Sequence, residues 1–161
     1  MPRAYEPPTA AELRTVTGPR PGTVALHDVL VWHYHARGVK SAGIYNRRNR
    51  RGVLGPVTAR GASLHAVGRA LDLATTDKAV HDEIFLRCIA AAEPCGIVEV
   101  ISWDRRWTPD KGVRPYRPGP GGSPHRDHVH VGQSVDVASR GANPQDADAL
   151  RKWFAHFLFE R

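Results

Sequence analysis

Two short segments of this chain alternate apolar and polar residues with the period of a β-strand, and this pattern constrains the fold most. Leu71 and Leu73 flank Asp72 in the first segment, and the second reads His128-Val129-His130-Val131. Residues two apart in a strand face the same side of a sheet. We therefore predict two strands, one presenting Asp72 on one face and the other presenting both histidines of its segment on one face.

A further histidine, His65, lies upstream of Asp72 in a segment that is expected to turn near Gly68. The small residues Gly68 and Ala70 would let a neighbouring chain segment approach a metal closely. If the two strands pair, His65, Asp72 and one histidine of the second segment come together. Three nitrogen or oxygen ligands, an open position for water and a nearby acid/base group suit one catalytic zinc ion. The pattern therefore predicts zinc-dependent hydrolysis of a bond.

A His-x-His pair by itself is only a weak indicator of a metal site. Isolated histidines are more often surface or hydrogen-bonded core residues, and we expect no function for four of them: His27, His33, His81 and His156. Cys88 is expected to be a small buried hydrophobe, and neither Cys88 nor Cys95 to bind zinc. A bond between the two cysteines stays open at this point, because Pro94 is expected to break the helix between them.

The remaining pattern predicts a single α+β domain with a small central antiparallel sheet and flanking helices. Residues 1–22 are rich in proline and polar residues and are expected to form an N-terminal arm, followed by the domain at 23–161. Helices are predicted over 23–37, from Thr76 to about Pro94, and after the N-cap Asn143. Further strands are predicted over 39–45 and 97–103, a basic loop over 47–52 and a long loop over 108–124.

The chain has 161 residues and a net charge of +7, with no apolar run long enough for a membrane span. A basic surface favours anionic polymers, such as nucleic acid or an anionic cell wall, although it is also typical of an arginine-rich composition. The first residues do not resemble a secretory signal. We expect a monomer without a membrane partner that is cytoplasmic until phage-type release to the cell wall, or extracellular by another route.

The residues Ser63-x-His65-x-x-Gly68-x-Ala70-x-Asp72 and Asp127-His128-x-His130 resemble the motifs of zinc peptidases that cleave peptidoglycan stem peptides. This group includes D-Ala-D-Ala carboxypeptidases, VanX- and VanY-type enzymes and phage endolysin peptidases, and it shares its fold with the hedgehog domain and lysostaphin-type enzymes. Actinobacterial and actinophage members are the most similar, through stretches like Trp103–Trp107, Pro115-Tyr116 and Pro124–His130. The resemblance covers about residues 40–133.

The resemblance implies that His65, Asp72 and His130 bind one zinc ion, with Ser63 supporting them through hydrogen bonds. Its VanX-type branch uses a carboxylate at the position of Asp127 as general base, usually glutamate, and its His-x-His branch uses the histidine at the position of His128. We favour Asp127 as the base and His128 as the group that stabilises the tetrahedral oxyanion.

An arginine ahead of the first motif helps to hold the oxyanion in this family. Arg48 is the best match here, with Arg47 and Arg60 as alternatives.

The function expected from the resemblance is hydrolysis of peptide bonds in peptidoglycan stem peptides or cross-links. The 108–124 loop would decide between endopeptidase and carboxypeptidase action. One alternative is a non-catalytic module that keeps the zinc fold and binds or supports the cell wall. A nucleic-acid enzyme is not expected, because the basic loop lacks both a phosphate-binding glycine motif and interleaved aromatic residues.

Overall fold

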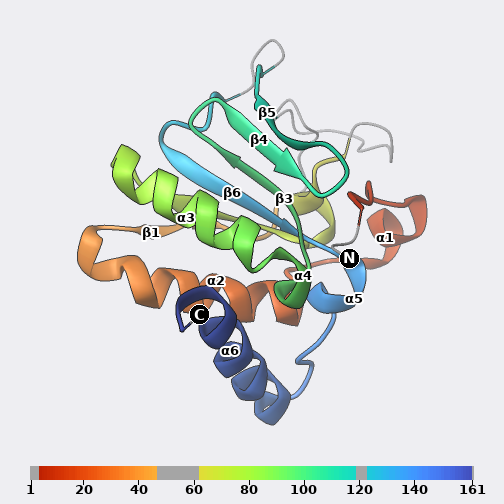
Figure 1. Ribbon diagram of the computed structural model, residues 1–161. Helices are drawn as coiled ribbons and strands as arrows, with labels where there is room; N and C mark the ends of the chain where they lie inside the picture. The colour runs from red at the N-terminus through yellow and green to blue at the C-terminus, as the bar shows by residue number, and fades with distance from the viewer. Residues whose placement is uncertain (1–3, 47–61, 119–122, 161) are drawn as a thin grey trace.

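A six-stranded antiparallel sheet organises residues 4–46, 62–118 and 123–160, which are the residues that the computed structural model describes (Figure 1). The strands lie in the order β1 (Lys40–Gly43), β2 (Ala70–Ala74), β6 (His128–Gln133), β3 (Ile97–Ser102), β4 (Arg105–Thr108) and β5 (Gly112–Pro115). Helices pack against the sheet, and the predicted α+β class with a central antiparallel sheet is confirmed.

Strand β2 pairs directly with β6, which meets the condition for bringing the expected ligands together, and Asp72 lies opposite His130 in this register. The leucines of β2 and the valines of β6 are fully buried in the main core cluster. Asp72 and His130 project from the other face of the sheet into a pocket. The two faces of one strand pair therefore separate the hydrophobic core from the polar cluster.

Three long helices supply the rest of the core: α2 (Pro21–Tyr34), α3 (Lys78–Ala90) and α6 (Pro144–Phe159). Short elements connect them, namely α1 (Ala10–Thr15), η1 (His35–Arg37), η2 (Leu64–Val67), α4 (Ala92–Cys95) and α5 (Val135–Ala138). The predicted N-cap of α6 is confirmed, because the Asn143 side chain accepts a hydrogen bond from the backbone N–H of Asp146. None of the described helices is long and apolar enough to cross a membrane.

Two local predictions need correction. Helix α3 is capped by Asp77, whose carboxylate accepts from two backbone N–H groups, rather than by Thr76. The predicted loop over 108–124 begins with a β-hairpin, in which Trp107 of β4 pairs with Val113 of β5. Gly112, at a φ of 62°, provides the left-handed backbone needed at the turn, and the buried Trp107 anchors β4 on the core.

The two cysteines lie in the main core cluster as free thiols. Burial raises the pKa of both, that of Cys95 to about 12. The expectation that Cys88 acts as a small buried hydrophobe is confirmed.

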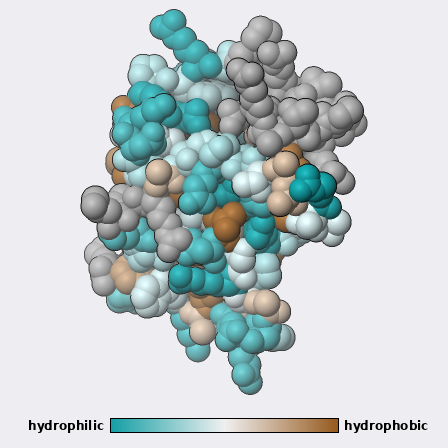
Figure 2. Space-filling view, turned by 90° about the vertical axis from the view of Figure 1, so that its right-hand side faces the viewer, coloured by the Kyte–Doolittle hydropathy of each residue, from teal (hydrophilic) through white to brown (hydrophobic). Residues whose placement is uncertain are grey.

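The N-terminal arm contains a helix and packs on the element that carries His65. Leu13 of α1 is buried against Ala66 and Val67 of η2. On the face of the molecule seen from the side of α1, the described residues are mostly hydrophilic (Figure 2). Gly68 ends η2 with a φ of 67°, and a Cβ there would lie 2.3 Å from the carbonyl oxygen of Gly18. The absence of a side chain at Gly68 thus leaves room for the N-terminal arm to pack there. The expectation that Gly68 makes room for a segment next to a metal is wrong.

A fully buried arginine holds the arm to the sheet. Arg69 Nε lies 3.2 Å from the carboxylate of Glu12, and one of its terminal nitrogens donates to the carbonyl of Glu6 at 2.9 Å. Glu12 also pairs with Arg20 at 2.9 Å. Burial lowers the pKa of Arg69, although the neighbouring glutamates oppose this shift. Glu12 is therefore the close counter-charge of a cation that has no access to water.

We predict that Glu12→Gln lowers the free energy of unfolding by about 3 kcal/mol, because it leaves a buried cation without its nearest anion. Denaturant unfolding of the two proteins measures the difference. Glu160→Gln is the matched control, since Glu160 is exposed and pairs only at the surface with His156, and its expected effect is below about 0.5 kcal/mol. Equal effects of the two substitutions would contradict the role of Glu12 as the counter-charge of buried Arg69.

Candidate metal centre

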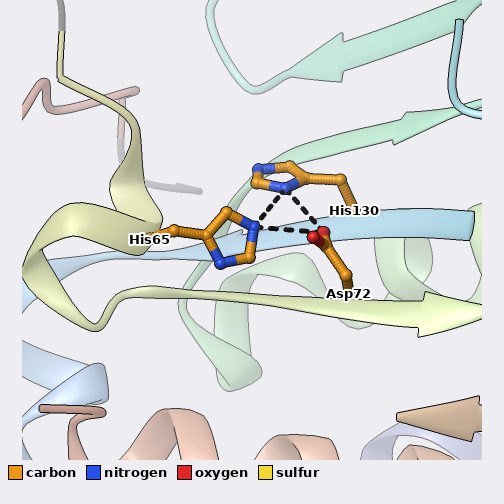
Figure 3. Close-up of side chains that lie close together, drawn as sticks. All are labelled: His65, Asp72 and His130. Carbon is orange, nitrogen blue, oxygen red and sulfur yellow. Dashed lines mark hydrogen bonds and ion pairs between the residues drawn. The ribbon is translucent and has the colours of Figure 1, made fainter. Parts of the chain in front are cut away.

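Three side chains meet on the polar face of the β2–β6 pair (Figure 3). The distance from His65 Nε2 to His130 Nδ1 is 3.1 Å, and Asp72 Oδ1 lies 3.1 Å from each of these nitrogens. All three ligands expected from the resemblance are thus brought together, from the short helix η2 and two neighbouring strands.

Local structure fixes the position of each donor atom. Asp72 and His130 lie opposite each other in the sheet, so their separation is set by strand pairing. His65 lies in η2, where Ser63 is the N-cap and its hydroxyl accepts a hydrogen bond from the His65 backbone N–H at 3.3 Å. Ser63 therefore supports the cluster through a hydrogen bond, as expected, and it does so by holding the backbone of His65.

The outer nitrogen of each histidine faces an oxygen. His65 Nδ1 lies 3.1 Å from the carbonyl oxygen of Ile44, which can only accept, so this nitrogen carries a proton and Nε2 is the nitrogen that would bind a metal. His130 Nε2 lies 3.4 Å from the carboxylate of Glu99. Metal-bound histidines almost always donate their second N–H to a carbonyl or carboxylate in this way.

The donor set and its spacing fit a zinc ion. Ligands at about 2.0–2.1 Å in a tetrahedral arrangement lie about 3.3 Å from one another, close to the edges of the triangle seen here. Two imidazole nitrogens and one carboxylate are typical of catalytic zinc sites, in which the fourth position stays open. The three residues also line a pocket, so a fourth ligand could enter from solvent.

Opposing effects govern the charges of the cluster in the metal-free protein. Burial raises the pKa of Asp72, but hydrogen bonds from His130 and His65 outweigh burial and hold that pKa well below its ordinary value. Burial lowers the pKa of His130, but its hydrogen bonds to Asp72 and Glu99 outweigh burial and raise the pKa to about 9. Without a metal, the cluster is thus held together by a proton on His130.

The two residues favoured for acid/base chemistry lie side by side at the start of β6. His128 is the first residue of the strand, and its Nε2 lies 4.0 Å from Asp72 Oδ1. Its Nδ1 donates to Asp127 Oδ1 at 2.7 Å. The Asp127 side chain is 75% exposed, against 17% for that of His128. The structure therefore brings His128 to the cluster and places Asp127 behind it.

A fourth histidine, His125, lines the pocket and was not assigned a role from the sequence. Its ring centroid lies 4.5 Å from that of His128, and its Nδ1 donates to the carbonyl of Ser123 at 2.9 Å. Burial, and then the charge of His130, lower the pKa of His125 to about 3, so the ring is neutral. Its position in the Pro124–His130 stretch was the available signal.

Four further residues of the pocket wall were given no role from the sequence: Glu99, Arg106, Tyr5 and Tyr116. A glutamate in the apolar run Ile97–Ile101 was a signal that could have been read, whereas nothing local indicates that Tyr5 of the arm reaches the site. Arg48, expected near the oxyanion, lies outside the described residues, as do Arg47 and Arg60; of the described part of the chain, Arg106 is the arginine in the wall.

His81 is a hydrogen-bonded core residue, as predicted. Its ring contacts the Ser102 hydroxyl at 2.7 Å and the Thr75 carbonyl at 2.8 Å, and burial lowers its pKa. Its hydrogen-bonding capacity is thus satisfied by the core.

The chain was also compared with known proteins. No protein-family model, no curated protein and no solved structure matches it. The site is therefore interpreted from its own geometry and from the sequence motifs.

The metal-free cluster has a testable pH dependence. Because the folded pKa of His130, about 9, exceeds its ordinary value of 6.5, its stabilising contribution is complete below pH 6.5 and is lost as the pH rises through about 9. Asp72 acts in the opposite sense, since its contribution exists above its ordinary pKa of 3.8 and is lost only in acid.

We predict that, in chelator, the native protein loses unfolding free energy between about pH 6 and about pH 9 relative to His130→Gln. Denaturant titrations of both proteins across this range measure the difference. Parallel pH profiles would show that His130 carries no stabilising proton. Saturating zinc should reduce the slope, because a metal-bound imidazole is not protonated.

Proposed function

We propose that this chain is a zinc-dependent hydrolase that cleaves peptide bonds in peptidoglycan stem peptides or cross-links. The observation that carries the proposal is the triangle formed by His65 Nε2, His130 Nδ1 and Asp72 Oδ1, with edges of 3.1 Å, in the wall of a pocket. Three ligands with an accessible fourth position distinguish a catalytic zinc site from a closed structural one.

The substrate class rests on the sequence. The spacing Ser63-x-His65-x-x-Gly68-x-Ala70-x-Asp72, with Asp127-His128-x-His130 downstream, resembles peptidoglycan peptidases. A net charge of +7 favours approach to an anionic cell wall.

Zinc in this site would supply Lewis acidity, which polarises a peptide carbonyl and lowers the pKa of water towards neutrality. In this proposal His128, whose Nε2 lies 4.0 Å from Asp72 Oδ1, accepts the proton of the attacking water and returns it to the leaving amine. Its Nδ1 is held by Asp127 at 2.7 Å, so Nε2 is the nitrogen available for this transfer. In this scheme Asp127 orients the base. The sequence had instead favoured Asp127 as the base and His128 as the group that stabilises the oxyanion.

Neutral His125 and Arg106 bound the space next to the cluster. His125 donates through Nδ1 to Ser123, which leaves Nε2 to accept a hydrogen bond. Arg106 adds guanidinium N–H donors to the wall, while its charge is paired with Glu99. Together these side chains suit a polar substrate with both donor and acceptor groups, such as a peptide backbone.

We predict that the purified chain releases peptide fragments from bacterial cell walls, that chelator stops the release, and that zinc restores it. His65→Ala should reduce zinc binding and turnover by at least about 100-fold, because it removes one of three ligands. His156→Ala is the matched control, since His156 lies at the surface of α6 and should retain full activity. Mass spectrometry of the released muropeptides identifies the bond that is cut.

Two results would overturn the proposal. Activity that persists in His65→Ala, or without zinc, would exclude metal-dependent hydrolysis by this site. Zinc binding and cell-wall binding without product release would identify the chain as the non-catalytic module considered from sequence.

The assignment of the base is tested separately. We predict that His128→Ala lowers kcat by about 10²- to 10⁴-fold with little change in KM, as expected for loss of general acid–base catalysis. Asp127→Asn should cost about fivefold or less, because an exposed pair contributes at most about 1 kcal/mol. If Asp127→Asn loses as much kcat as His128→Ala, Asp127 is the base and His128 assists it.

A further inference from the structure

A single carboxylate is buried in the middle of strand β3. Glu99 is only 5% exposed, and its neighbours Val98 and Val100 are fully buried and apolar. The register of β3 against β6 shifts between Ile97 and Glu99, and Glu99 lines the pocket while Val100 packs in the main core. A buried charge is unfavourable unless it is paired and hydrogen-bonded, so the contacts of this carboxylate indicate why it is there.

Each oxygen of the carboxylate has a partner. Glu99 Oε1 lies 2.5 Å from a terminal nitrogen of Arg106, and Oε2 lies 3.4 Å from His130 Nε2. The Arg106 guanidinium in turn lies over the ring of Tyr5, 5.3 Å from its centroid. Glu99 is thus held on one side by the pocket wall and reaches the outer nitrogen of His130 on the other.

Asp72 at 3.1 Å and Glu99 at 3.4 Å each face one ring nitrogen of His130. If a metal took the Asp72 carboxylate and the Nδ1 lone pair, Glu99 would be the carboxylate left to accept a hydrogen bond, and the proton of the neutral imidazole would be held on Nε2. The lone pair is then on Nδ1, the nitrogen that lies 3.1 Å from both His65 Nε2 and Asp72 Oδ1. The opposite tautomer would set a nitrogen lone pair against the carboxylate and point a proton into the metal position.

We propose that Glu99 is a positioning residue, which orients His130 and fixes the tautomer that binds the metal, and that Arg106 keeps Glu99 in place. The inference rests on the proposed zinc site and adds to it a residue outside the motifs. His65 has the equivalent outer partner in the Ile44 carbonyl, so each imidazole of the site is held from behind.

A simpler role for Glu99 would be counter-ion to Arg106. Arg106 keeps 26% of its side chain exposed, however, whereas Glu99 is enclosed. Because Arg106 reaches the surface, a carboxylate at the surface could pair with it. Pairing with Arg106 therefore does not by itself explain why a carboxylate is buried within β3. Opposite Glu99 in the sheet stands Gly132, where a Cβ would lie 2.4 Å from Leu64 Cδ1 and 3.8 Å from Glu99 Oε2. The missing side chain leaves room for Leu64 of η2, next to His65, directly beside the carboxylate.

The test compares native protein with Glu99→Gln, which preserves shape and removes the charge. We expect the zinc dissociation constant, measured by competition with a chromophoric chelator, to rise about 10- to 100-fold. With cobalt in place of zinc, the visible absorption bands should shift, because the orientation of one ligand changes. Far-UV circular dichroism of both metal-free proteins establishes that the fold is kept. Glu160→Gln, the same change at an exposed site, should leave affinity and spectrum unaltered.

If Glu99→Gln alone does not fold, the double substitution Glu99→Gln with Arg106→Gln also removes the unpaired guanidinium, and the same affinity loss is expected from it. A folded variant with native zinc affinity and a native cobalt spectrum would overturn the positioning role while the proposed function stands. A native chain that binds neither ion would overturn the proposed function, and this inference with it.

Discussion

The register of β2 against β6 is the constraint on which the rest of the structure depends. It places Asp72 opposite His130, so two donor atoms meet because two backbones are hydrogen-bonded. A slip of one residue would turn every side chain of a strand to the other face. Such a slip would move Leu71 and Leu73 out of the core, where both are fully buried. The hydrophobic core therefore sets the geometry of the polar cluster.

This dependence explains which parts of the fold could be predicted. Strands β2 and β6 follow from alternation, and α6 follows from its N-cap and first-turn proline, since both signals are local. The β4–β5 hairpin was missed because its segment is dense in proline and glycine, and these residues are equally typical of loops. Its pairing depends on the anchoring of Trp107 in the core, a contact that no local pattern contains.

In the candidate site, too, the residues marked by local motifs could be predicted, and those brought in by long-range contacts could not. Its three proposed ligands were expected from the motifs, whereas Glu99, Arg106 and Tyr5 reach the pocket through long-range packing. In a regular strand, adjacent residues such as Asp127 and His128 would face opposite sides of the sheet. Since β6 begins at His128, Asp127 is free of that alternation and contacts the imidazole directly. The two side chains are therefore hydrogen-bonded, and under the proposed function they would take complementary roles.

Backbone strain is concentrated beside this pocket. Trp103, Asp104 and His125 are the non-glycine residues with positive φ among those described. Two of them are joined, because the Trp103 N–H donates to the His125 carbonyl at 2.8 Å, while Asp104 holds Arg126 through its carboxylate. Such conformations persist only where surrounding contacts enforce them, and they cluster at functional sites. The β3–β4 turn thus fixes the segment that carries His125, just before the strand that presents His128 and His130.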